Sequence, residues 1–208
     1  MDIYLAVEDA LSEAVAEKLL LSSGAGFQIQ QRFCKRGNGY LKSNMDKFSN
    51  IAKATPLLLI TDLDSEDCAP GLIKRWLGKK KPPKELLFRV AVRETEAWLL
   101  ADADGFAAFS GVPVTKIPPE VENLPDPKST LIDLVRRYGK RSLRTDIVPE
   151  PGVCAKVGLA YNQALCPFVR ESWSPERAEQ VANSLARVRR SIGELGLLKN
   201  EKIAHRNG

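Results

Sequence analysis

Apolar and polar positions alternate in blocks along the first half of the chain. Four segments have the apolar character of strands: residues 2–7, 27–33, 57–61 and 86–92. Three segments between them have helical spacing or composition: residues 11–21, 41–54 and 71–77. Strands that alternate with helices predict a mainly parallel sheet of about four strands, joined by right-handed crossovers.

The second half of the chain has a different pattern. Five of the 13 prolines fall between Pro113 and Pro127, which predicts a long irregular connection. Helical spacing follows at residues 128–138, 153–165 and 175–198. We therefore predict an α/β domain over residues 1–110 and a proline-rich connection with a C-terminal helical layer over residues 111–208.

Composition narrows the class of protein. With 44% hydrophobic and 27% charged residues among 208, the chain is neither disordered, collagenous nor a coiled coil. The N-terminus has no secretory pattern and no apolar run reaches the roughly 18 to 20 residues of a membrane span, so we expect a cytoplasmic protein without a membrane partner. The four cysteines have neither zinc-ribbon nor disulfide-framework spacing.

Acidic residues follow three of the four predicted strands. Glu8 ends the first, Asp62 and Asp64 end the third, and Glu94 and Glu96 follow the fourth. The carboxyl ends of parallel strands meet at one edge of a sheet, and carboxylates gathered there repel one another unless a cation neutralises them. Oxygen ligands without His or Cys favour Mg²⁺ or Mn²⁺ over zinc. Taken alone, the Asp62-x-Asp64 pair is as typical of a turn or a helix cap as it is of a metal site.

These residues carry a family resemblance. A glutamate after the first strand, then an apolar strand running into Asp-x-Asp, resembles the Toprim domain of topoisomerases, primases and overcoming-lysogenization-defect nucleases. The segment 93–102, followed by 125–128, resembles the bacterial domain of unknown function 4276, which is itself Toprim-like. One position departs from the pattern, because Asp9 stands where these families have a glycine that permits a close backbone approach.

The resemblance implies a function. Glu8 corresponds to the Toprim glutamate that acts as general acid/base or metal ligand, and Asp62 and Asp64 correspond to its metal-binding aspartates. Glu94 and Glu96 match the acidic motif of the second family. The implied activity is Mg²⁺- or Mn²⁺-dependent cleavage or processing of nucleic-acid phosphodiesters, in defence against phage or mobile elements.

Basic residues supply candidate contacts to such a substrate. Lys35 and Arg36 lie in a glycine-rich loop, and each can bind a backbone phosphate or be ordinary solvated surface. Lys128 follows Pro127, and it can bind phosphate or balance charge in the acidic cleft, although the start of a helix explains the Pro-Lys pair equally well. We expect a nucleic-acid partner, DNA in preference to RNA. The chain has no GxxxxGK[ST] motif, so an ATPase function would need a separate partner chain, and an oligomer is compatible with the sequence.

Two other functions fit parts of the pattern. In a phosphatase of the haloacid-dehalogenase type, Asp62 would be the nucleophile and Asp64 the acid/base, although that motif normally lies on the first strand. In a non-catalytic binding or regulatory module, the acidic edge would hold a structural cation or dock a partner ATPase.

Overall fold

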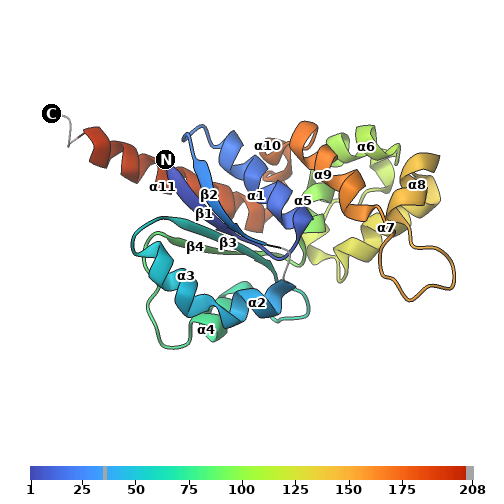
Figure 1. The fold of residues 1–208 in the computed structure, drawn as a ribbon. Helices are drawn as coiled ribbons and strands as arrows, with labels where there is room; N and C mark the ends of the chain where they lie inside the picture. Colours follow the sequence, from blue (N-terminus) through green and yellow to red (C-terminus); the bar gives the residue numbers. More distant parts are fainter. Residues whose placement is uncertain (35–36, 205–208) are drawn as a thin grey trace. The chain divides into compact units, whose positions relative to one another are not determined.

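The computed structural model describes residues 1–34 and 37–204 of the chain. Two compact units are distinguished: a sheet unit, formed by Met1–Val90 and Ala186–Gly208, and a helical unit, formed by Ala91–Leu185 (Figure 1). The chain thus passes from one unit to the other twice, whereas the sequence predicted one boundary after residue 110.

Four strands form the sheet. They are β1 (Asp2–Ala6), β2 (Gln28–Phe33), β3 (Leu57–Asp62) and β4 (Leu86–Ala91). The strand order is β2-β1-β3-β4, and all four strands run parallel. The predicted α/β fold with a four-stranded parallel sheet is therefore confirmed, and each predicted strand lies within about two residues of its observed position.

The register of the central strands determines which residues meet at the carboxyl edge. β1 pairs with β3 so that Tyr4 lies opposite Leu57 and Ala6 lies opposite Leu59. β3 is buried at every residue except Asp62, and β1 is buried at Ile3, Leu5 and Ala6, as expected for parallel strands covered on both faces. Residues that follow Ala6 therefore approach the end of β3.

Helices cover both faces of this sheet. Those of the sheet unit are α1 (Ala10–Ser22), α2 (Gly37–Ser43), α3 (Met45–Ala52), α4 (Ala69–Leu77) and the part of α11 (Asn183–Ala204) that begins at Ala186. α3 and α4 lie on one face, while α1 and α11 lie on the other (Figure 1). The close packing of α11 is evident at Gly196, where an added Cβ would lie 2.6 Å from the Cβ of Ala25.

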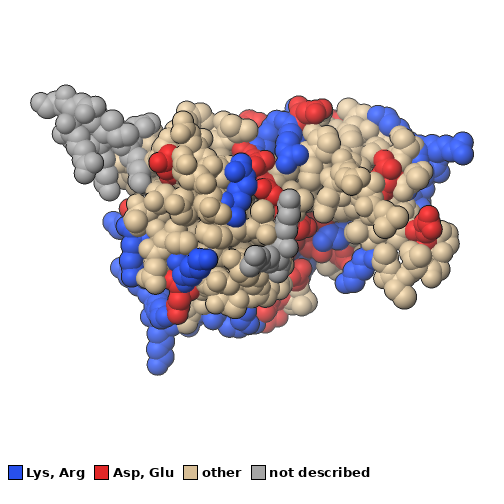
Figure 2. Space-filling model, in the orientation of Figure 1, with Lys and Arg blue, Asp and Glu red and all other residues tan. Residues whose placement is uncertain are grey.

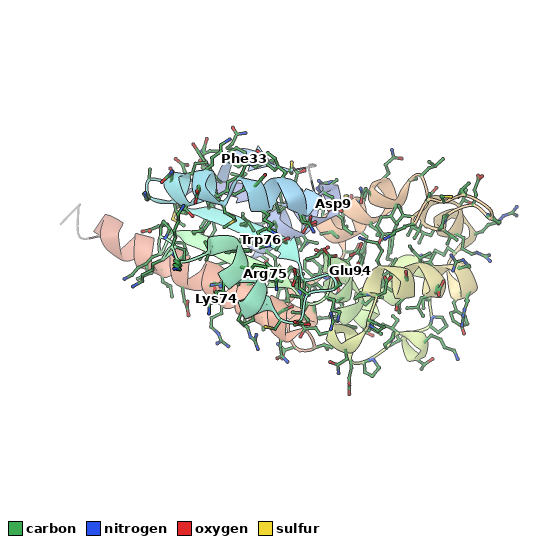
Figure 3. All side chains as sticks on the ribbon, turned by 90° about the horizontal axis from the view of Figure 1, so that it is seen from below. Asp9, Phe33, Lys74, Arg75, Trp76 and Glu94 are labelled. Atoms are coloured by element: carbon green, nitrogen blue, oxygen red, sulfur yellow. The ribbon has the colours of Figure 1, made fainter. Side chains whose placement is uncertain are left out.

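Aromatic side chains help to attach the helices to the sheet. Trp76 of α4, labelled in Figure 3, packs on Phe88 of β4 with ring centroids 5.4 Å apart. The predicted helix over residues 41–54 is two helices, because the chain leaves helical geometry at Asn44. The Asn44 side-chain amide donates to the Tyr40 carbonyl oxygen at 2.9 Å, a local bond that competes with the helical ladder.

The helical unit contains short helices around a tryptophan-rich core. They are α5 (Thr95–Ala101), α6 (Ala103–Ser110), α7 (Pro127–Tyr138), α8 (Arg141–Ile147), α9 (Tyr161–Glu171) and α10 (Pro175–Ala178), with 3₁₀ turns η1 (Val114–Lys116) and η2 (Val121–Asn123). Trp173 donates its indole N–H to the Trp98 carbonyl oxygen at 3.0 Å, and Trp98 donates to the Ser184 hydroxyl at 2.8 Å. Both rings are fully buried, so Trp98 anchors this core.

Two predicted helices are wrong in part. The helix expected over residues 153–165 begins only at Tyr161, because the preceding loop is fixed by Gly158, whose N–H donates to the Ile147 carbonyl oxygen at 2.8 Å. A Cβ at Gly158 would come within 2.3 Å of the Asp146 carbonyl oxygen, so this close approach requires glycine.

The helix expected over residues 175–198 is interrupted between α10 and α11. Its beginning is as predicted, since the Ser174 hydroxyl caps α10 at the Arg177 N–H. α11 starts afresh because the Glu122 carboxylate accepts the backbone N–H groups of Asn183 and Ser184 at 3.0 and 2.8 Å. No such capping partner from η2 could be recognised in the local sequence.

The surface shows no large region of a single charge on the visible face, where acidic and basic side chains are interspersed (Figure 2). Among the helices of the described residues, none is both long enough and apolar enough to cross a membrane.

Candidate functional site

The glutamate after β1 reaches across to β3. One oxygen of the Glu8 carboxylate, Oε1, accepts a hydrogen bond from the Asp62 N–H at 2.9 Å and another from the Thr61 hydroxyl. These residues are 54 and 53 positions away in the chain, and the pairing of β1 with β3 brings them together. The structure therefore places Glu8 beside Asp62 at the carboxyl edge of the sheet, as the strand pattern predicts.

The second aspartate of the pair lies in a turn just beyond β3. Asp64 has a φ of 51°, a left-handed conformation that Asp tolerates better than most residues. Its Oδ2 accepts from the Asn38 side-chain amide at 3.2 Å, and the Glu8 carbonyl oxygen accepts from the Gly37 N–H at 3.1 Å. The first residues of α2 thus bridge the two loops that carry Glu8 and Asp64.

The environment of Glu8 favours its protonated form. Burial raises the pKa of the Glu8 carboxyl above its ordinary value, and the negative charges of Asp64 and Asp9 raise it further. The hydrogen bonds from Thr61 and the Asp62 N–H oppose this shift. Glu8 therefore keeps its proton at a higher pH than an exposed glutamate does.

Asp9, which stands where the Toprim pattern has glycine, has a local structural role. It is the N-cap of α1, and its Oδ1 accepts from the Ser12 N–H at 2.8 Å and from the Ser12 hydroxyl at 2.9 Å (Figure 3). Its φ of −144° is extended backbone that any residue adopts. This position therefore does not require glycine, and the departure from the family pattern does not distort the end of β1.

Glu96 forms a second carboxylate site within the helical unit. It is 2% exposed, accepts from the Tyr161 hydroxyl at 2.8 Å and lies 3.4 Å from the Lys128 ammonium. Burial raises the pKa of the Glu96 carboxyl and Glu94 adds to that effect, whereas Lys128 and the Tyr161 hydrogen bond lower it. Glu96 is thus a buried acid with its own counter-ion.

Glu94 and Lys128 complete this second cluster. Glu94 is the residue before α5, and its Oε2 accepts the Lys128 backbone N–H at 2.8 Å in the first turn of α7. Lys128 therefore contacts Glu94 through its main chain and Glu96 through its side chain. The structure places these acids in the helical unit, and Glu8, Asp62 and Asp64 in the sheet unit.

The fit of a metal ion depends on the carboxylates of the sheet unit. Over residues 1–34 and 37–204, no three His, Cys, Asp or Glu side chains are grouped so as to hold a metal by themselves. Mg²⁺ seldom uses such a cage, because it keeps several waters and binds through one or two carboxylates and substrate phosphates. Asp62 and Asp64, with Glu8 beside them, have the oxygen chemistry that this mode of binding uses.

Two of the predicted phosphate-binding residues lie outside the described part of the chain, and two residues that contact the site carboxylates were not predicted. Lys35 and Arg36 lie outside the described residues, so their role in phosphate binding stays a prediction. Sequence reasoning missed Thr61 and Tyr161. Thr61 had a signal, as the single polar residue at the end of an apolar strand, whereas Tyr161 had none, because it contacts Glu96 from 65 residues away.

Comparison of the chain with family models, with curated proteins and with solved structures found no match.

Proposed function

We propose that this protein is a metal-dependent enzyme that cleaves or otherwise processes nucleic-acid phosphodiester bonds, with Glu8, Asp62 and Asp64 as its site. The observation that carries the proposal is the hydrogen bond from the Asp62 N–H to Glu8 Oε1. It joins the ends of two neighbouring parallel strands at the edge where ligands bind in open α/β sheets. The resemblance of these three residues to the Toprim pattern supports the same assignment.

The three carboxylates suit different tasks. Asp62 and Asp64 would hold Mg²⁺ or Mn²⁺, and the ion would neutralise charge on the phosphate and activate water. Glu8 is anchored by hydrogen bonds at Oε1, and the raised pKa of its carboxyl suits a group that gives a proton to the leaving oxygen. Asn38 positions Asp64 through its side-chain amide.

The partners of Glu8 also favour a functional role over a purely structural one. Its hydrogen-bond donors are neutral, and within the described residues no Lys or Arg forms an ion pair with it. Two acids, Asp64 and Asp9, lie close enough to raise its pKa. A bound cation would offset this accumulation of negative charge.

The proposed substrate is nucleic acid, DNA in preference to RNA, and the biological setting is defence against phage or mobile elements. We also propose that any ATP-dependent step is supplied by a separate ATPase chain. Co-migration of the two chains in size-exclusion chromatography tests this partnership. If the chains do not co-migrate in any nucleotide state, the partnership is refuted.

Cleavage assays test the activity directly. Plasmid and single-stranded DNA are incubated with the full chain and Mn²⁺ or Mg²⁺, and Glu8→Gln and Asp62→Ala are compared with Asp67→Asn. Asp67 is an exposed acid five residues beyond Asp62 and is the matched control. We expect each site variant to lose about 100-fold or more of the rate, whereas the control keeps it. Equal cleavage by all four proteins would overturn the site.

Calorimetry provides a readout that does not depend on turnover. Mn²⁺ titrated into the wild-type chain should release or absorb heat with a saturable isotherm, and Asp62→Ala combined with Asp64→Ala should abolish it. A wild-type protein that binds no Mn²⁺, alone or with an oligonucleotide present, contradicts the proposed function.

A further inference from the structure

An open groove lined by arginines lies on the helical unit. It has a volume of about 400 Å³ and is formed by the end of α7, by α8 and by the loop that follows α8. Three of its lining side chains are Arg136, Arg141 and Arg144, and we call this feature the arginine groove. Basic side chains are visible at the surface around α8 (Figure 2).

The charges in the arginine groove are only partly balanced. Arg136 pairs with Asp133 on its own helix, and Glu150 is the one carboxylate among the described lining residues. Arg141 and Arg144 are exposed, and among the residues that the structure describes neither forms an ion pair. Guanidinium groups remain charged at any physiological pH, so these two present permanent positive charge to a ligand.

A smaller apolar hollow adjoins the arginine groove. It has a volume of about 150 Å³, and Val153, Val157 and Leu159 are among its lining residues. It shares Thr145, Val148, Pro149 and Glu150 with the groove, so these four residues border both features. The Leu159 side chain is fully exposed and Val153 is 51% exposed.

The loop that forms this apolar hollow is tied to α8 at its C-terminal end. The Gly158 N–H donates to the Ile147 carbonyl oxygen at 2.8 Å, and the Ala160 N–H donates to the Asp146 carbonyl oxygen at 3.2 Å. These bonds tie the end of the loop back to α8. The part of the hollow next to Leu159 is therefore fixed to α8.

We propose that the arginine groove and the apolar hollow together bind single-stranded nucleic acid. Arg141 and Arg144, with Arg136, hold successive backbone phosphates, and the hollow receives one unstacked base. A single strand is the occupant because a duplex keeps its bases stacked inside, away from a hollow beside its phosphates. The inference rests on the proposed function for the class of polyanion, and it assigns a surface that holds the strand.

Binding without divalent metal tests the arginines. Anisotropy of a labelled short oligothymidylate is measured in EDTA with the full chain, with Arg141→Gln/Arg144→Gln and with Arg137→Gln/Arg190→Gln. The control pair also removes two positive charges, but from exposed arginines that do not line the groove. The groove variant should bind the oligothymidylate about tenfold more weakly. The slope of log affinity against log salt concentration should also be shallower by about 1.4, which is about 0.7 for each lost phosphate contact.

The base contact has its own variant. Ala155 is an exposed lining residue of the apolar hollow, and Ala155→Leu adds an aliphatic side chain there without offering a ring on which a base could stack. Wild-type protein should prefer the oligothymidylate over an abasic strand of equal length, and Ala155→Leu should reduce that preference. Equal binding of both strands by the wild-type protein overturns the role of the hollow.

Other outcomes redirect or refute the proposal. Competition by thymidine monophosphate at the concentration where the oligonucleotide competes would assign the site to free nucleotides, and competition by inorganic phosphate would reduce it to an anion site. Tighter binding of a matched duplex, or equal affinity of the two arginine double variants, also overturns it. Unchanged strand affinity in the groove variant, together with loss of cleavage in Asp62→Ala, would refute the groove and leave the proposed function standing. If the arginine groove binds the strand but the protein neither binds Mn²⁺ nor cleaves, the proposed function is refuted and the groove stands.

Discussion

Glu8 of the sheet unit and Glu96 of the helical unit are both acids whose burial raises their pKa, but they are compensated differently. Glu96 has the Lys128 ammonium 3.4 Å away and a hydrogen bond from the Tyr161 hydroxyl. Glu8 has only neutral donors among the described residues, and nearby acids add to the repulsion. A buried acid with an internal cation contributes to the fold, whereas one without such a cation is suited to an external proton or metal ion.

The largest effect expected from this comparison is at Lys128. Lys128→Met removes the cation that faces Glu96 and leaves the Glu96 carboxyl, which is 2% exposed, without the ammonium that offsets its burial. We expect the free energy of unfolding at pH 7 to fall by about 3 kcal/mol, measured by urea denaturation. Adding Glu96→Gln to this variant should restore most of the loss. A single variant as stable as the wild type would show that Lys128 does not compensate Glu96.

Stabilisation by Mn²⁺ should depend on the carboxylates of the sheet unit and not on Glu96. At a free Mn²⁺ concentration of about 100 times Kd, a site in the sheet unit stabilises the fold by about 2.7 kcal/mol. The thermal midpoint should therefore rise by several degrees in the wild type and in Glu96→Gln, but not in Asp62→Ala, by scanning calorimetry. A rise that persists in Asp62→Ala would place the ion elsewhere.

Neutralising Glu8 should stabilise the protein. The pKa of Glu8 is raised above its ordinary 4.5 in the folded state, so its proton favours folding below pH 4.5, and this contribution is lost as the pH rises through the folded-state pKa. Glu8→Gln should therefore match the wild type near pH 4 and exceed it by about 1 kcal/mol at pH 8, in thermal unfolding with EDTA. Glu96→Gln is the comparison, because it removes the carboxylate that lies 3.4 Å from the Lys128 ammonium and should give no such gain. A Glu8 variant less stable than the wild type at pH 8 would contradict the desolvation argument.

The smallest effect concerns Asp9, which lies next to Glu8 but caps α1. Asp9→Ala should cost about 1 kcal/mol through loss of the bonds to Ser12, and Asp9→Gly only a few tenths. Urea denaturation of both variants measures the difference. Cleavage activity should persist in Asp9→Gly, which places the glycine of the Toprim pattern at this position, and loss of activity would make Asp9 part of the site.

Local patterns were sufficient to predict the sheet. The apolar runs that become β1 and β3 belong in the interior of the fold. Because strands alternate with helices, the sheet is parallel, and the carboxylates that follow these two strands lie at the same edge of it. Glu8, Asp62 and Asp64 could thus be assigned to one edge of the sheet from the amino-acid pattern alone. The failures were also local in origin, since the spacing at residues 153–160 is that of a helix although the chain there is a loop.

The succession of strands and helices in the first half of the chain, and the acids that end the strands, follow from the amino-acid order, because hydrophobic periodicity is a property of neighbouring residues. Three other features depend on the folded chain: Tyr161 and Lys128 compensate Glu96, Glu122 starts α11, and arginines of α7 and α8 share a groove with a loop. Those contacts join residues from separate segments, and their hydrogen bonds and charges meet only when packing of the apolar core has brought the segments together.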